Sequence, residues 1–251
     1  MTRARFAYLD SEQPIAFAHR GGAHEHPENT LPAFEAAVRL GYRYLETDVH
    51  ATADGVLLAF HDDRLDRVTD RSGIIRALPY AEVKQARVAG AEPIPLLEEL
   101  LGSFPGVRVN IDAKADHSVH PLISALRRTN SLDRVCLGAF SHKRLQRMRA
   151  ILGPDVCTSA SPVEVLRVRV GRSPGPGPAC LQVPVRHGRM PVTDARFVAT
   201  AHKLGLPVHV WTVDDEAEMD RLLDLGADGI MTDRPHVLKQ VLERRGHWPA
   251  G

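Results

Sequence analysis

The stretch Val208–Arg244, VHVWTVDDEAEMDRLLDLGADGIMTDRPHVLKQVLER, contains two successive strand-and-helix patterns. Val208 to Thr212 and Gly229 to Thr232 are short apolar runs of the kind that forms buried strands. Each is followed by a run with the apolar spacing of an amphipathic helix, first Glu216 to Leu225 and then Pro235 to Arg244. Strands and helices in this order indicate parallel βα units, in which a helix connects one strand to the next.

The same alternation extends over most of the chain. Further strands are predicted at Ile15 to His19, Tyr42 to Val49, Val107 to Ala113, Val135 to Phe140, Val156 to Ser159 and Cys180 to Val183. Further helices are predicted at Pro32 to Leu40, Leu96 to Leu101, Pro121 to Arg128, Lys143 to Leu152, Pro162 to Val170 and Asp194 to Leu204. Eight βα units in 251 residues predict a single α/β domain over residues 1–251, a (β/α)8 TIM barrel. An open doubly wound sheet is the alternative, but no GxGxxG motif follows the first strand.

One strand-like run, Val56 to Phe60, breaks the alternation. Too few residues separate it from the strand before it for a crossover helix. Asp54-Gly55 favours a two-residue hairpin turn between the two runs, which would place Asp48 opposite His61. We therefore predict an inserted hairpin or cap segment at about residues 50–95, after the second barrel strand.

The composition excludes several classes of protein. With 32 basic and 31 acidic residues, the net charge of +1 argues against a nucleic-acid partner. The cysteines, Cys136, Cys157 and Cys180, lack metal-ligand spacing and are expected to be reduced core residues. Met1 to Pro14 has no apolar run of signal-peptide length, and the longest apolar stretch is too short to cross a bilayer. We expect a cytoplasmic protein with a small-molecule partner and no stable membrane insertion; the oligomeric state is left open.

Polar residues interrupt two strands that should be apolar on both faces. Glu46 and Asp48 are two positions apart and share one face, and Asn110, Asp112 and Lys114 share a face of another strand. Three carboxylates near neighbouring strand ends suit a hard divalent cation, Mg²⁺ or Ca²⁺. The alternative is that they only form ion pairs with Arg20, Arg43 and Lys114.

Two histidines end strand-like runs at the same predicted edge. His19 closes the first strand, and His61 closes the run after the hairpin turn. Histidine can both accept and donate a proton near neutral pH, as displacement at phosphorus requires. Strict alternation would place His19 and Arg20 on opposite faces, so both reach one site only if the strand ends at His19 and Gly21-Gly22 turns the chain.

The motifs of this chain, taken in order, resemble those of the glycerophosphodiester phosphodiesterase family. They are His19-Arg20-Gly21, Pro27-Glu28-Asn29-Thr30, Glu46-Thr47-Asp48-Val49, Thr52-Ala53-Asp54-Gly55, His61-Asp62, Leu65-Asp66-Arg67-Val68-Thr69, Asn110-Ile111-Asp112-Ala113-Lys114, Trp211-Thr212-Val213 and the run Gly226 to Pro235. The resemblance covers residues 15 to 240. It implies a TIM barrel with a small insertion that hydrolyses glycerophosphodiesters to glycerol 3-phosphate and an alcohol, with a divalent metal cofactor.

The resemblance also implies roles for individual residues. His19 and His61 match the acid/base pair, Glu46 and Asp48 match two metal ligands, Arg20 and Lys114 match phosphate-binding positions, and Trp211 matches a tryptophan that contacts substrate or fills the core. Asp112 stands where the family's third metal ligand is usually glutamate, so its reach is shorter by one methylene. Ala139-Phe140 stands where relatives tend to have Ser-Phe, which removes one polar contact.

Four questions are left open by the sequence. Either histidine can be the acid, and the nucleophile is either water or a substrate hydroxyl that forms a cyclic phosphate. A lysophospholipase D-like or sphingolipid head-group phosphodiesterase on the same barrel would need an apolar groove, for which Leu57, Leu65, Val68 and Ile74 to Leu78 are candidates. A non-catalytic phosphodiester-binding barrel is the remaining alternative.

Overall fold

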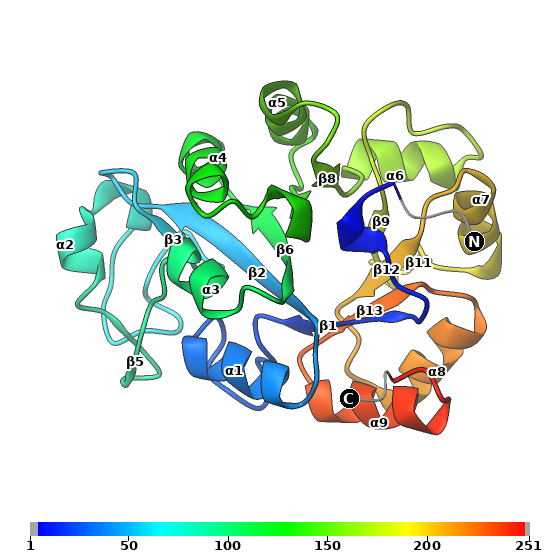
Figure 1. The fold of residues 1–251 in the computed structure, drawn as a ribbon, viewed down its shortest axis with the longest axis horizontal. Helices are drawn as coiled ribbons and strands as arrows, with labels where there is room; N and C mark the ends of the chain where they lie inside the picture. The colour runs from blue at the N-terminus through cyan, green and yellow to red at the C-terminus, as the bar shows by residue number, and fades with distance from the viewer. Residues whose placement is uncertain (1–4, 249–251) are drawn as a thin grey trace.

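The computed structural model describes residues 5–248, and a closed parallel sheet forms its centre (Figure 1). Residues 1–4 and 249–251, which belong to the predicted 1–251 span and include the start of the Met1–Pro14 segment, lie outside the described residues. The strands are β1 (Ile15–His19), β2 (Tyr44–Ala51), β6 (Arg108–Ala113), β7 (Val135–Gly138), β8 (Cys157–Thr158), β9 (Leu181–Pro184), β12 (Val208–Trp211) and β13 (Gly229–Thr232). Their order is β8-β7-β6-β2-β1-β13-β12-β9, and all of these pairs are parallel.

The first and last strands of this order meet and close the barrel. Ser159 and Cys180 form a parallel bridge between the ends of β8 and β9. The amide of Ala160 donates to the carbonyl of Cys180 at 2.9 Å, and the amide of Ala179 donates to that of Thr158 at 2.8 Å. The sequence-based prediction of a (β/α)8 barrel is therefore confirmed.

Helices surround the barrel, as Figure 1 shows. They are α1 (Leu31–Arg39), α3 (Leu97–Ser103), α4 (Val119–Arg128), α5 (His142–Leu152), α6 (Pro162–Arg169), α7 (Ala195–Lys203), α8 (Glu216–Asp224) and α9 (Pro235–Arg244). Five of them begin at a residue whose side chain accepts a hydrogen bond from a first-turn amide, namely Thr30, Ser141, Ser161, Asp194 and Asp215. Such caps satisfy amides that have no partner within the helix, so they determine where each helix starts.

The interior of the barrel is filled by side chains at the end where the strands begin. Phe17 of β1, Tyr44 of β2 and the three cysteines pack together there. A short 3₁₀ helix, η1 (Ala7–Leu9), covers this end with the buried Tyr8, whose carbonyl accepts a hydrogen bond from the Tyr44 hydroxyl. Cys136, Cys157 and Cys180 are free and buried, as the sequence predicts. Because side chains fill this end of the barrel, an active site is expected at the opposite end, where the strands finish.

Residues 52–96 form a small inserted unit beside β2. It contains β3 (Leu57–Ala59), η2 (Ile75–Ala77), α2 (Tyr80–Val83), β4 (Arg87–Val88) and β5 (Glu92–Pro93). A separate apolar cluster holds it together, with Leu58, Leu65 and Ile75 almost fully buried. In Figure 1 this unit extends from one side of the barrel, around α2 and β5.

The predicted register of the hairpin is wrong by one residue. Val49 pairs with Ala59, and Phe60 rather than His61 lies opposite Asp48, to whose carbonyl the Phe60 amide donates at 2.9 Å. The loop has three residues instead of two: the Thr52 amide donates to the Val56 carbonyl at 2.9 Å, and Gly55 adopts the left-handed conformation (φ 82°) that a three-residue hairpin loop requires. Asp-Gly is compatible with both loop lengths, so the dipeptide alone does not select the register.

One small hairpin and two 3₁₀ helices complete the fold. A small hairpin, β10 (Arg186–His187) with β11 (Met190–Pro191), follows β9 at the open end of the barrel. The 3₁₀ helices η3 (Asp116–Ser118) and η4 (Leu132–Arg134) precede α4 and β7. Within residues 5–248 no helix has both the length and the apolar character needed to cross a bilayer.

Candidate active site

His19 and Arg20 reach the same cavity because the chain turns sharply after β1. The strand ends at His19, and Arg20, Gly21 and Gly22 all have positive φ values of 51°, 84° and 99°. A Cβ atom on Gly21 would lie 2.8 Å from Cβ of Ala33, so the turn packs directly on α1. This is the turn that the sequence requires for both side chains to face one site.

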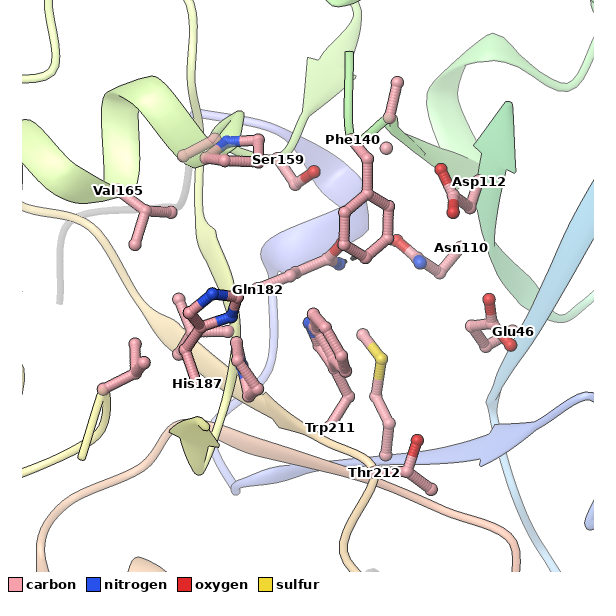
Figure 2. Close-up of a pocket in the computed structure, with 18 of the residues that line it drawn as sticks. Glu46, Asn110, Asp112, Phe140, Ser159, Val165, Gln182, His187, Trp211 and Thr212 are labelled. Atoms are coloured by element: carbon pink, nitrogen blue, oxygen red, sulfur yellow. Dashed lines mark hydrogen bonds between the residues drawn. The ribbon is translucent and has the colours of Figure 1, made fainter. Parts of the chain in front are cut away.

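The three carboxylates come together through the register of β1, β2 and β6. His19 pairs with Glu46, Glu46 with Asn110, and Asp48 with Asp112. Figure 2 shows Glu46, Asn110 and Asp112 directed into the cavity from the same side. The carboxylates are buried, with 4%, 2% and 9% of Glu46, Asp48 and Asp112 exposed, so their charge must be compensated inside the protein.

Two cations compensate part of this charge. The Lys114 ammonium lies 2.8 Å from Asp48 Oδ1 and 2.7 Å from Asp112 Oδ2, while Arg20 Nε lies 3.1 Å from Asp48 Oδ2. Burial alone would raise the pKa of Asp48, but Lys114 and Arg20 outweigh burial and hold it below its usual range. Arg43, the third cation considered from sequence, is exposed and takes part in no ion pair within the described chain.

Glu46 is the least compensated carboxylate of the three. Its closest cationic neighbour is His19, whose Nε2 lies 3.7 Å from Glu46 Oε2. Burial and then the neighbouring Asp48 raise the pKa of Glu46 to about 7. Among the described residues, no lysine or arginine lies within ion-pair distance of the Glu46 carboxylate, so burial and Asp48 determine the direction of its shift.

The donor chemistry of this cluster fits a hard divalent cation. Asp112 Oδ1 is buried without a hydrogen-bond partner, Asp48 Oδ2 has the Arg20 ion pair but no hydrogen bond of good geometry, and all the candidate ligand atoms are carboxylate oxygens. As the side chains stand, Lys114 lies between Asp48 and Asp112. No three acidic, histidine or cysteine side chains within residues 5–248 are placed as a ready set of metal ligands.

His19 is held by a carboxylate from the far end of the chain. Its Nδ1 lies 2.7 Å from Oδ1 of Asp233, which follows β13. Burial lowers the pKa of His19, but Glu46 and Asp233 outweigh burial, so the net shift is upward. Asp233 lies in the run Gly226 to Pro235 used for the resemblance, but sequence reasoning assigned it no role.

His61 has a carboxylate partner of its own. Its Nδ1 lies 2.5 Å from Oδ1 of the adjacent Asp62, and Arg67 Nε holds Asp62 Oδ2 at 2.6 Å. Burial raises the pKa of Asp62, but the hydrogen bonds from Arg67 and His61 outweigh it and bring the value to about 2. Arg67 also donates to both carboxylate oxygens of Glu28, and Glu28 accepts a hydrogen bond from Arg20. One charged network therefore links the loop that follows His19 to the loop that contains His61.

A cavity of about 650 Å³ connects these groups. Among the residues that line it are all the candidates from sequence: His19, Arg20, Glu46, Asp48, His61, Asp112, Lys114 and Trp211. Gln182 of β9 lies at its centre and donates to Asn110 Oδ1 at 2.7 Å (Figure 2).

The sequence suggested that residues of the insertion could line an apolar groove. In the structure, these residues do not line the cavity. Leu57, Leu65 and Ile75 are buried within the protein, and none of the candidate groove residues lines the cavity of the described chain. The apolar lining instead comes from α6, from the β10–β11 hairpin and from Phe140 and Trp211. Sequence reasoning missed this hairpin, because the strands have only two residues each.

Comparison with known proteins assigns the chain to a family. The family model "Glycerophosphoryl diester phosphodiesterase family" matches residues 19–237. The chain belongs to this family. A probable glycerophosphodiester phosphodiesterase 2 of Mycobacterium tuberculosis is 39% identical over 93% of this chain and 92% of its own length. A glycerophosphodiester phosphodiesterase of Caldanaerobacter subterraneus is 30% identical over 92% of this chain and 99% of its own.

Solved structures of the glycerophosphoryl diester phosphodiesterase family share the fold. A putative member from Silicibacter pomeroyi matches with a TM-score of 0.83 at 23% identity, covering 97% of this chain and 100% of that one. A phosphodiesterase from Oleispira antarctica, solved with the product sn-glycerol-3-phosphate, matches with a TM-score of 0.79 at 25% identity, covering 94% and 99%. Membership makes this chain a phosphoric diester hydrolase by class.

Proposed function

We propose that this chain hydrolyses glycerophosphodiesters to glycerol 3-phosphate and an alcohol, with His19 and His61 as the general acid/base pair. One observation carries the proposal: two histidines, each bonded through Nδ1 to a carboxylate, border one cavity with buried carboxylates and cations. The names of the relatives and the product bound to the Oleispira antarctica enzyme support the substrate class.

The carboxylate partners explain how the histidines act. A bond from Nδ1 to Asp233 or Asp62 fixes the ring and leaves Nε2 to exchange a proton with the substrate. One histidine takes the proton of the nucleophile while the other protonates the leaving oxygen. Both partners also stabilise the positive charge that each ring carries in its protonated form.

The phosphate is held by the charged residues around it. The Arg20 guanidinium offers a planar fork and the Lys114 ammonium a point charge to the non-bridging oxygens. Glu46, Asp48 and Asp112 would hold a divalent cation, Mg²⁺ or Ca²⁺, and such an ion neutralises charge on phosphate oxygens. The three carboxylates together with Arg20 and Lys114 carry one net negative charge. A bound divalent ion would change this sum to one net positive charge. We therefore expect the binding of the phosphodiester anion to depend on metal.

The proposal is tested on the purified chain with a panel of metals and glycerophosphodiesters. We expect turnover only with a divalent ion, and we expect His19→Ala and His61→Ala each to lose roughly 10² to 10⁴ in rate while remaining folded. Full turnover by either variant would remove that histidine from the mechanism. Activity that survives exhaustive chelation would exclude an essential metal at the carboxylates.

A phosphodiester-binding barrel without catalysis is tested in the same preparation. Calorimetric titration of glycerol 3-phosphate, with and without Mg²⁺ or Ca²⁺, should show binding that strengthens with metal. Binding without any turnover in the panel would favour the non-catalytic alternative.

A further inference from the structure

His50 is a buried histidine of β2 that takes no part in the proposed acid/base chemistry or in phosphate binding. It follows Asp48 by two positions and Glu46 by four, so the three side chains share one face of the strand. Only 5% of His50 is exposed. A buried polar side chain needs a hydrogen-bond partner, and the identity of that partner indicates what His50 does.

The partner of His50 is the main chain of His61. His50 Nε2 lies 3.0 Å from the carbonyl oxygen of His61. A carbonyl oxygen only accepts hydrogen bonds, so Nε2 carries a proton and donates it. The ring of His61 is bonded separately, through Nδ1, to Asp62. His50 therefore holds the backbone of His61, while Asp62 holds its ring.

The segment 61–63 lies between two cavities. His61 lines the cavity of about 650 Å³ that contains the reacting groups. His50 and Asp63 line a second cavity of about 330 Å³, and Lys114 lines both cavities. Residues beside a cavity have fewer packing contacts on that side. The position of this segment therefore depends strongly on its hydrogen bonds.

Within the described chain, two hydrogen bonds connect residues 60–63 directly to the barrel. The Phe60 amide donates to the Asp48 carbonyl at 2.9 Å, and His50 donates to the His61 carbonyl. The other hydrogen bonds of residues 60–63 lead to partners inside the insertion. Of the two connections to the barrel, the one from His50 is made by a side chain, so a substitution can remove it alone.

We propose that His50 is a positioning residue for His61. Its bond to the His61 carbonyl sets where the His61 ring lies relative to His19, because the two histidines belong to different units of the fold. The inference rests on the proposed function, in which His61 exchanges a proton with the substrate. Loss of the bond should slow the chemical step more than it weakens substrate binding, since Arg20 and Lys114, which hold the phosphate, belong to the barrel.

Steady-state kinetics with glycerophosphocholine and a divalent metal test this role. His50→Leu removes the donor, and we expect kcat to fall about 10- to 100-fold with KM changed less than about twofold, because a misplacement of about 1 Å can cost 10² in rate. His50→Gln keeps an N–H donor near the place of Nε2 and should restore most of the activity. The side chain of His50→Asn is shorter by one methylene and should not restore it.

His117→Leu is the control. His117 Nε2 also lies 3.2 Å from a main-chain carbonyl, that of Ala51, and His117 borders the same second cavity as His50. Its bond leads to neither histidine of the acid/base pair, so His117→Leu should keep the activity of the wild type.

A double-mutant cycle separates positioning from a purely structural role. If His50 acts through His61, His50→Leu should lower kcat no further in the His61→Ala background. An equal loss of kcat in both backgrounds overturns the inference, as does a loss confined to KM or wild-type kinetics of His50→Leu. If His50→Leu does not fold, His50→Gln and His50→Asn decide, and equal activities of these two variants overturn the inference.

These outcomes leave the proposed function intact. Full turnover by His61→Ala would instead overturn the proposed acid/base pair and, with it, the role of His50.

Discussion

His19 and Asp233 are 214 positions apart, yet their contact determines how the histidine presents its second nitrogen to the cavity. The residue types at the site were recognisable from local patterns, since carboxylates two apart on one strand share a face whatever lies around them. The partners were not, because Asp233 and Arg67 lie on other loops. At this scale the sequence predicts the reacting side chains and leaves their orientation undetermined.

The variant Asp233→Asn tests whether Asp233 orients and stabilises the His19 ring. The variant keeps the shape of the side chain but cannot stabilise a protonated His19, so we expect kcat to fall by about 10² or more with a much smaller change in KM. Steady-state kinetics and the free energy of unfolding are measured together. Asp228→Asn is the control, because it alters another histidine–carboxylate pair, with His202 at 2.8 Å, outside the cavity. Equal losses of activity in both variants would contradict a positioning role for Asp233.

At the scale of elements, α6 carries part of the apolar lining of the cavity and depends on a buried ion pair. Glu164 accepts from the Ser161 amide at 2.7 Å at the start of the helix and from Arg149 of α5 at 2.6 Å. Burial raises the pKa of Glu164, but Arg149 and the Ser161 amide outweigh it and lower the value. The capping box of Ser161 and Glu164 is formed by residues three apart in the sequence, whereas the partner on α5 is supplied by the tertiary structure.

Glu164→Gln should lower the free energy of unfolding by about 3 kcal/mol at neutral pH, because it leaves the Arg149 charge buried without its counter-charge. Because the folded-state pKa of Glu164 is depressed, its stabilisation is present above the unfolded-state pKa and is lost as pH falls through the folded-state pKa. The difference between wild type and variant should therefore shrink below about pH 4.5.

Urea unfolding at neutral and acid pH measures this difference. Glu218→Gln, which weakens the exposed pair with Arg221 on α8, should cost less than about 0.5 kcal/mol. A stability difference for Glu164→Gln that stays constant over this pH range would show that the ion pair is not its source.

At the scale of the whole molecule, the barrel and the inserted unit have separate apolar clusters. Within the barrel, the strand pairing is uneven. Strands β2 and β6 pair over six residues, whereas a single bridge connects the ends of β8 and β9. The insertion supplies His61 and Asp62, so its local stability bears directly on the site. We expect the insertion to open independently of the barrel.

Ile75→Ala tests this independence. Ile75 is fully buried in the insertion, so the cavity left behind should destabilise that unit by about 2 to 5 kcal/mol. Hydrogen exchange should then accelerate at residues 57–94 and remain slow in β2 and β6. Ile111→Ala, in the barrel core, is the comparison and should accelerate exchange throughout. Equal acceleration in both regions by Ile75→Ala would show that the two units unfold together.

The sequence alone determined the repeat of strands and helices, and with it the barrel, because hydrophobic periodicity and capping residues act over a few neighbouring positions. It also placed Glu46, Asp48 and Asp112 on strand faces. The tertiary structure alone decided the hairpin register, where Asp54-Gly55 allows two loop lengths, and the contacts of Asp233 and Arg67 with the histidine loops. It also formed the apolar lining of the cavity from α6, the β10–β11 hairpin and Phe140. These features depend on which distant segments meet at the open end of the barrel, and a local pattern carries no information about that meeting.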